Sequence, residues 1–244
     1  MEAAFTLARR MGKTPVVVKD TPGFIVNRIL MPYLATAVRE LERTGDVAII
    51  PRADAAMAAF GMPMGPFALL DQIGLDVAAK VAGVLKEAFP RSPGDARLFH
   101  AMMQAGLLGV KSGRGFYRYS SGRKPQKVSP ELAPLLAATY RHPAAGAPDR
   151  GDGRTAGADS QVDALVNSML DAMINEAASL IEEGAVDRPE TIDLAMIFGT
   201  GFPPFRGGLL RHADRVGPQA VADRLRARGI TPSPLLERTG RFYA

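Results

Sequence analysis

The side chain with the clearest potential for chemistry is Asn27, which follows the loop signal Pro22-Gly23 in the stretch KDTPGFIVNRILMPYL, residues 19–34. A side-chain amide both donates and accepts hydrogen bonds, so Asn27 can orient a catalytic base or hold a substrate carbonyl. The other interpretation is a local hydrogen bond at a helix start, and residue type alone favours it. Asn167 takes the same place in a related segment further along the chain, which weakens any functional reading based on residue type.

Other polar candidates are weaker. The stretch GVKSGRG, residues 109–115, departs from the phosphate-binding pattern GxxxxGK[ST], so a surface turn is favoured. Arg206, next to Gly207-Gly208, can bind an anion or serve as a cap or ion-pair partner.

The histidines and the absence of cysteine limit the chemistry further. Of the three histidines, His142 lies at the predicted linker and is expected to be solvated, and His100 and His212 lie on predicted helices with no acidic partner at a useful spacing. We therefore predict no metal site and no complete catalytic constellation. The lack of cysteine excludes disulfides, thiolate metal sites and cysteine nucleophiles.

Composition describes a globular protein of 244 residues, 47% of them hydrophobic, with a net charge of +5. The positive charge favours an anionic partner, but the basic residues are scattered and match no nucleic-acid motif. No apolar run reaches the roughly 20 residues of a membrane span, and the N-terminus lacks a signal peptide. We therefore expect a cytoplasmic protein that binds no nucleic acid and does not span a membrane.

Apolar spacing predicts a mainly helical fold. A helix starting after Thr21 is expected to bend at Pro32 and end at Gly45, and further helices are expected at 52–60, from about 68, and at 97–108. The helix after Thr21 has an apolar stripe formed by Val26, Leu30, Leu34, Val38 and Leu41. A later helix has a second stripe, formed by Leu165, Met169, Met173 and Leu180. Before the first of these helices, residues 1–20 read as a helix and a β-branched strand, Val16–Val18, typical of the end of a larger α/β domain.

An internal repeat organises the chain. Residues 27–45 align with residues 167–184; the two segments read NRILMPYLATAVRELERTG and NSMLDAMINEAASLIEEG. Each is followed by a segment of the type Asp-x-Ala-Met. Each copy then reaches a Phe-Gly…Pro-Phe loop, at 60–67 and 198–205, and Phe67 or Phe205 is expected in the core. Corresponding positions are separated by 138 to 140 residues, so we predict two related helical units.

Four segments of the chain in combination resemble the C-terminal part of L-3-hydroxyacyl-CoA dehydrogenases. They are KTPVVVKDTPGFIVNRILMPYL, GMPMGPFALLDQIGLD, GVKSGRGFYRY and GTGFPPFRGG. The two-copy arrangement is most similar to the α subunit of the multifunctional fatty-acid oxidation enzyme. The resemblance implies tandem helical units of the 6-phosphogluconate-dehydrogenase C-terminal type. The expected division is a remnant of a Rossmann-like domain at 1–20, a first helical unit at 21–119, a linker at 120–160 and a second helical unit at 161–244.

The resemblance also implies a function. In this family an N-terminal Rossmann domain binds NAD and supplies a catalytic histidine–glutamate pair, and the asparagine of the GFIVNR motif lies beside that pair. The matching residue here is Asn27, which the resemblance makes both a catalytic and a substrate-binding residue. The implied pathway is fatty-acid β-oxidation, the implied substrate is an acyl-CoA, and a thiolase subunit is a candidate partner.

The same comparison implies that this chain depends on a further domain. The sequence contains no GxGxxG fingerprint, and none of its histidines stands in the catalytic motif. We therefore expect it to lack the NAD-binding domain and the histidine–glutamate pair, to need a Rossmann domain in cis or in trans, and to be inactive alone. The second copy is expected to replace the partner subunit that single-copy members recruit, which predicts a pseudo-two-fold relation between 21–119 and 161–244.

Three alternatives stay open. The chain can be a non-catalytic helical interaction module that has lost the dehydrogenase chemistry. Within the family it can belong to the hydroxybutyryl-CoA dehydrogenases of short-chain or aromatic-degradation pathways. A nucleic-acid binder is a more distant alternative, because it requires the Lys and Arg side chains to gather on one face.

Overall fold

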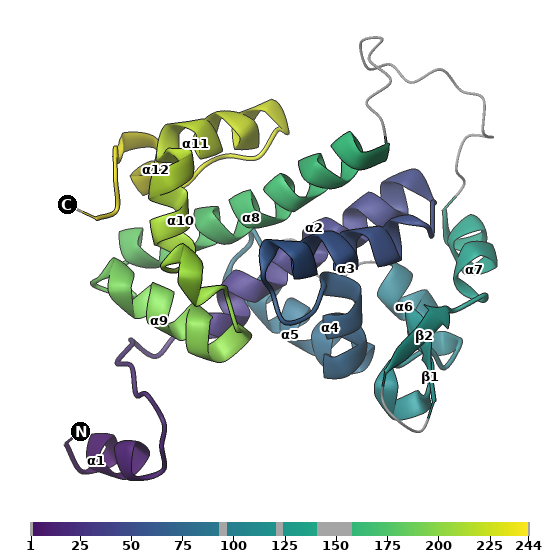
Figure 1. Ribbon diagram of the computed structural model, residues 1–244, viewed down its shortest axis with the longest axis horizontal. Coiled ribbons are helices and arrows are strands. Elements are labelled where there is room, and N and C mark those ends of the chain that lie inside the picture. Colours follow the sequence, from purple (N-terminus) through teal and green to yellow (C-terminus); the bar gives the residue numbers. More distant parts are fainter. Residues whose placement is uncertain (1, 93–96, 121–123, 141–157, 244) are drawn as a thin grey trace. The chain divides into compact units, whose positions relative to one another are not determined.

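The computed structural model describes residues 2–92, 97–120, 124–140 and 158–243, and the predicted mainly helical fold is confirmed. The helices and strands are α1 (Glu2–Arg10), α2 (Val26–Thr44), α3 (Ile49–Phe60), α4 (Pro66–Ile73), α5 (Leu75–Ala88), α6 (Arg97–Gln104), η1 (Val110–Ser112), β1 (Tyr117–Tyr119), β2 (Pro125–Val128), α7 (Leu132–Thr139), α8 (Ala158–Glu182), α9 (Pro189–Thr200), η2 (Pro204–Arg206), α10 (Leu209–Val216), α11 (Pro218–Ala227) and α12 (Pro234–Arg238). Figure 1 labels these elements.

The chain divides into two compact units by its contacts. One unit comprises residues 30–172, and the other comprises residues 1–29 together with 173–244. The boundaries fall inside α2 and α8, so each of these long helices contributes to both units. The first residues of α2, including Asn27, therefore belong to the same unit as α9 to α12.

The unit of residues 30–172 is built on the apolar face of α2. Leu34, Val38 and Leu41 are fully buried, as the apolar spacing predicts. The helix passes through Pro32 and ends before Gly45, whose φ of 65° lies in the left-handed region that favours glycine. Helices α3 to α7 pack successively onto one another, and β1 pairs with β2 in an antiparallel two-stranded sheet.

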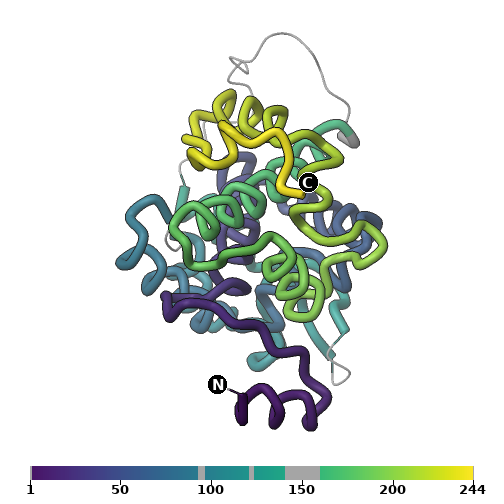
Figure 2. Tube along the Cα trace, turned by 90° about the vertical axis from the view of Figure 1, so that its left-hand side faces the viewer, coloured from purple at the N-terminus to yellow at the C-terminus, as the bar shows by residue number. Residues whose placement is uncertain are grey.

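The unit that contains the C-terminal residues packs α9, α10, α11 and α12 in succession. Ile192, Met196, Phe202, Leu209 and Leu225 form part of its buried core. In this unit α1 has no buried residue, and both views show it apart from helices α9 to α12 of the same unit (Figures 1 and 2).

The strand expected at Val16–Val18 does not form. Residues 13–20 follow an extended path without ladder pairing, and Val16 and Val17 are exposed. A β-strand is stable only beside another strand, and no described strand runs alongside this segment. That residues 1–20 end a Rossmann-like domain stays a prediction.

The segment assigned to the linker is partly folded. Residues 125–128 form β2, and residues 132–139 form α7, whose Leu132 and Leu136 are buried. The apolar pair at a spacing of four residues is enough to dock this short helix against α6. Residues 141–157, the Gly/Pro/Ala-rich part of the predicted linker, lie outside the described residues.

The two copies of the repeat share an anchoring pattern at their second helix, which is α3 in the first copy and α9 in the second. In α3, Asp54 accepts hydrogen bonds from the backbone N–H groups of Phe67 and Ala68, at 2.9 and 3.0 Å, in the first turn of α4. In α9, Asp193 likewise accepts from Leu210 and Arg211, at 2.7 and 3.2 Å, in the first turn of α10. The carboxylates satisfy N–H groups that have no partner within the helix, so each aspartate joins two helices of its copy.

This pattern corrects the loop alignment. Gly65 and Gly208 precede the anchored helices and lie against Asp54 and Asp193. Their separation along the chain exceeds the 138 to 140 residues of the sequence repeat, because η2 lengthens the second loop. As a result Phe67 is fully buried at the start of α4, whereas Phe205 in η2 is 74% exposed. The expectation that Phe205 enters the core is therefore wrong.

Candidate functional site

Asn27 is the second residue of α2, and its side chain is exposed. The preceding loop is a tight turn in which the Phe24 N–H donates to the Thr21 carbonyl at 2.9 Å. Pro22 and Gly23, with φ of 76° at the glycine, suit the two central positions of such a turn. The turn brings the chain into α2 so that the Asn27 amide faces outward at the helix start.

Phe24 adds backbone strain at this place. It has a φ of 48°, the one non-glycine residue in the left-handed region among the described residues. This conformation is costly for a bulky side chain, and such residues cluster at functional sites. The Phe24 ring is also 54% exposed, so an apolar surface borders Asn27.

A charged cluster formed by Arg28, Glu176 and Glu183 holds the start of α2. The Arg28 side chain is 2% exposed, and its Nε donates to Glu176 Oε1 at 2.6 Å. Its Nη2 donates to Glu183 Oε2, also at 2.6 Å. Ile25 and Ile29 on either side are buried, so the first turn of α2 is anchored by both packing and ion pairs.

Two backbone approaches complete this anchoring. A Cβ placed on Gly199 would lie 2.7 Å from Val26 Cγ2, so only glycine lets α9 approach α2 this closely. The Lys19 N–H donates to the Ala185 carbonyl at 3.2 Å. The segment before Asn27 is therefore held by residues of the second copy, within one compact unit.

The structure gives the surroundings of the other polar candidates. Asn167 is exposed in the middle of α8. The Lys111 ammonium in the GVKSGRG loop pairs with Asp76, so its charge already has a protein partner. The Arg206 guanidinium lies over the Phe205 ring, 5.4 Å from its centroid.

The histidines also remain separate. His100 is exposed in the middle of α6, and His212 is buried in α10 beside Phe202. His142 lies outside the described residues. Among the residues that the structure describes, no group of three His, Asp or Glu side chains is placed to hold a metal ion.

Sequence reasoning missed a buried aspartate–tyrosine cluster in the unit of residues 30–172. Asp71 accepts from the backbone N–H groups of Phe116 and Tyr117, both at 2.8 Å, and from the Tyr119 hydroxyl at 2.9 Å. The Tyr117 hydroxyl donates to Asp54 at 2.9 Å. The signal that could have found this cluster is the recurrence of Asp at equivalent places in two apolar helices.

Burial controls the electrostatics of this cluster. Desolvation raises the pKa of Asp71 to about 6, against the lowering effect of its three hydrogen bonds. Desolvation likewise raises the pKa values of Asp54, Tyr117 and Tyr119. These groups join β1 to α3 and α4, far along the chain from Asn27, and their role is to hold the fold.

The equivalent cluster closes the second copy. Asp214 accepts from the N–H groups of Phe242 and Tyr243, at 2.7 and 3.0 Å, and the Tyr243 hydroxyl donates to Asp193 at 2.6 Å. Burial raises the pKa of Asp193, and it also raises that of Tyr243. The Phe-Tyr pairs at 116–117 and 242–243 therefore do the same structural work in both copies.

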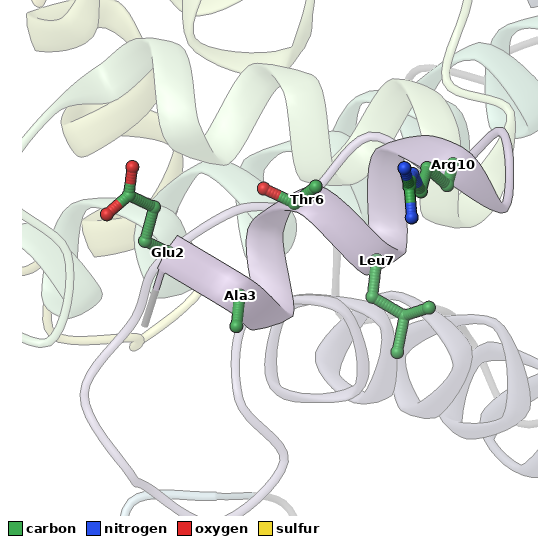
Figure 3. A pocket seen from close by; sticks show the side chains of 5 residues that line it. All are labelled: Glu2, Ala3, Thr6, Leu7 and Arg10. Atoms are coloured by element: carbon green, nitrogen blue, oxygen red, sulfur yellow. The ribbon is translucent and has the colours of Figure 1, made fainter.

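The surface hollow shown in Figure 3 lies on α1 alone. Its lining residues are Glu2, Ala3, Thr6, Leu7 and Arg10. Since none of them is buried and all come from one short helix, the hollow holds no convergent set of polar groups and is not a candidate site.

No described helix is both long and apolar enough to cross a bilayer.

The chain is similar in sequence to a known protein family over both copies of the repeat. The model of the 3-hydroxyacyl-CoA dehydrogenase C-terminal domain matches residues 23–119 and again residues 165–239, so the two matches follow the repeat. The fatty acid oxidation complex subunit alpha of Idiomarina loihiensis is 36% identical over 239 residues, covering 96% of this chain and 31% of that protein. The corresponding subunit of Vibrio cholerae is 39% identical over 219 residues, covering 89% of this chain and 28% of that protein. The chain thus spans less than a third of these relatives.

Solved structures agree on the fold. The Escherichia coli 3-hydroxybutyryl-CoA dehydrogenase superposes with a TM-score of 0.68 at 22% identity, over 97% of this chain and 63% of that one. The dehydrogenase part of multifunctional enzyme 1 from C. elegans superposes with a TM-score of 0.56 at 24% identity, over 85% and 43%. From the two family matches and the shared fold, the chain belongs to the 3-hydroxyacyl-CoA dehydrogenase C-terminal domain family.

Proposed function

We propose that the chain is the substrate-binding C-terminal portion of an NAD-dependent L-3-hydroxyacyl-CoA dehydrogenase of fatty-acid β-oxidation, with Asn27 at the active site. The observation that carries this proposal is the exposed amide of Asn27 at a rigidly anchored helix start, in a region matched by the family model. The strained, exposed Phe24 beside it supports an open functional face.

NAD does not fit the residues of this chain. Its sequence has no GxGxxG motif, and the described residues contain no parallel strand pair with a crossover helix. We therefore assign the dinucleotide and the proton-transferring histidine–glutamate pair to a Rossmann domain in cis or in trans.

Asn27 contributes positioning and polarity. Its Nδ2–H donates to the oxygen at C3 of the acyl-CoA, and its Oδ1 accepts from the imidazole of the partner domain. A fixed amide favours the reacting geometry because it needs no reorganisation when charge develops on the oxygen. The chain's positive net charge favours the approach of the CoA phosphates.

Reconstitution tests this proposal. The chain is mixed with the NAD-binding half of a related dehydrogenase, and oxidation of NADH by acetoacetyl-CoA is followed at 340 nm. We expect turnover in the mixture and none from either polypeptide alone. If the two halves associate but NADH is not oxidised, the dehydrogenase proposal fails.

The competing proposal is a non-catalytic interaction module. Under this alternative, the exposed face around Asn27 binds a partner but no substrate. Isothermal titration with acetoacetyl-CoA in the presence of the NAD-binding half separates the two, because only the dehydrogenase portion binds the thioester. A thiolase subunit is a further proposed partner, tested by co-purification with the reconstituted enzyme.

A further inference from the structure

Arg28, the residue after Asn27, binds two carboxylates far along the chain. The sequence separation is 148 residues to Glu176 and 155 residues to Glu183. Glu176 lies in α8 and Glu183 directly follows that helix, so they are seven residues apart. Seven residues are about two helical turns, or roughly 10 Å along the axis, so both carboxylates face the same way.

The fork geometry makes the contact directional. The Nε and Nη2 atoms point to different carboxylates, so the planar guanidinium is fixed in orientation as well as in position. Glu176 is 13% exposed and Glu183 is 35% exposed, so water screens this cluster only in part. Rotation or sliding of the first turn of α2 would break at least one of the two ion pairs.

The repeat shows that this cluster is not a general requirement of the helical unit. The position equivalent to Arg28 in the second copy is Ser168, whose hydroxyl donates to the Ala164 carbonyl of its own helix at 2.7 Å. The aspartate anchors, by contrast, occur in both copies. Of the two copies, the one with the strained Phe24 turn before its asparagine has the charged cluster, and the other has Ser168 at the equivalent position.

We propose that Arg28 is a positioning residue that fixes Asn27 through Glu176 and Glu183, so that the second copy holds the active-site residue of the first. This inference rests on the proposed function. It gives the second copy a role in catalysis beyond filling the place of a partner subunit. Arg28 itself contacts neither substrate nor cofactor.

The test is a double-mutant cycle between Arg28→Lys and Asn27→Ala in the reconstituted enzyme. Lysine keeps the charge but cannot bridge two carboxylates with a rigid fork. We expect Arg28→Lys to lower kcat about 10-fold to 100-fold, as small misplacements of catalytic groups do, with KM changed less than 3-fold. In the Asn27→Ala background, the same change should leave kcat within 2-fold.

The matched control is a second arginine–glutamate fork, between Arg238 of α12 and Glu182 at the end of α8. Arg238 donates to the two Glu182 carboxylate oxygens at 3.2 and 2.5 Å, so Arg238→Lys and Glu182→Gln remove a similar pair that does not include Arg28. Both should retain wild-type kcat, whereas Glu183→Gln should reproduce part of the Arg28→Lys effect. Equal losses of kcat for Arg28→Lys with and without Asn27 would overturn the inference, as would a wild-type kcat for Arg28→Lys.

A measurement independent of activity separates this inference from the proposed function. The Ile29 N–H donates to the Ile25 carbonyl at 3.0 Å and reports on the first turn of α2. Its hydrogen exchange should be at least 10-fold faster in Arg28→Lys than in wild type and unchanged in Arg238→Lys. Unchanged exchange in Arg28→Lys overturns the inference even where the enzyme is active, and an inactive wild-type mixture overturns only the proposed function.

Discussion

Asp54 and Asp193 make the same three hydrogen bonds in the two copies of the repeat: two from backbone N–H groups at a helix start and one from a tyrosine hydroxyl, Tyr117 or Tyr243. Each aspartate is thus the point where three segments of its copy meet. Such an arrangement joins the helix of each aspartate to the helix that follows it and to the tyrosine segment.

Replacement of Asp193 by alanine should be strongly destabilising. The change leaves two backbone N–H groups and the Tyr243 hydroxyl without their acceptor, so we expect the free energy of unfolding to fall by about 2–4 kcal/mol. Urea denaturation followed by circular dichroism measures this. The control is Asp223→Ala, an exposed partner of Arg226, which should cost less than about 1 kcal/mol. Similar losses for both variants would refute the anchoring role.

Gly65 should not tolerate a side chain. A Cβ at this position would lie 2.1 Å from the Cα of Asp54, a contact with backbone that cannot move aside cheaply. We expect Gly65→Ala to lower the thermal midpoint by more than about 5 °C, the shift that roughly 1–2 kcal/mol produces in a domain of this size. Gly83→Ala is the control, because its Cβ enters open space within α5 and alanine favours a helix. A Gly65→Ala variant as stable as Gly83→Ala would contradict the close approach.

The two loop phenylalanines should differ although their sequences align. Phe67 is fully buried and its ring meets Phe116 edge to face with centroids 4.9 Å apart, so Phe67→Ala should cost about 3–5 kcal/mol. Phe205 is exposed, so Phe205→Ala should change stability by less than about 0.5 kcal/mol. Chemical denaturation of both variants decides this, and equal costs would restore the simpler alignment of the loops.

Asp71 should make stability depend on pH in a defined direction. Its pKa of about 6 in the folded protein exceeds the ordinary value of 3.8, so the folded state binds the proton more tightly. The stability that Asp71 contributes is therefore full below about pH 4 and is lost as the pH rises to about 6, by roughly 1–3 kcal/mol.

The wild type and Asp71→Asn are compared to isolate this contribution. The asparagine variant cannot titrate, so the stability advantage of the wild type should be larger at pH 4 than at pH 7. Urea midpoints at half-unit pH steps give the difference. An advantage that is constant, or that grows toward pH 7, would show that the hydrogen bonds to Asp71 outweigh its burial.

Local patterns were sufficient to predict part of this structure. The stripes of α2 and α8 follow the helical period, and Leu34, Leu41, Met169 and Met173 are buried as that period requires. The strand at Val16–Val18 was predicted wrongly, because β-branched residues indicate a strand only where a neighbouring strand exists to pair with it.

Non-local contacts could not be predicted in the same way. Tyr117 is 63 residues from Asp54, and Glu183 is 155 residues from Arg28, so no local spacing reveals either pair. Asn27 was identified by its motif, but the anchoring of its helix start depends on residues of the other copy. That Asn27 acts in catalysis stays a prediction.

The most direct measurement is kcat of the reconstituted enzyme for Asn27→Ala and Asn167→Ala, assayed side by side with acetoacetyl-CoA and NADH. The two asparagines occupy equivalent positions and both are exposed, so the pair controls for the loss of a surface amide. We predict that Asn27→Ala lowers kcat about 100-fold, as the loss of a transition-state hydrogen bond does, and that Asn167→Ala leaves it unchanged. Equal kcat values for the two variants would contradict the assignment of Asn27 to the active site.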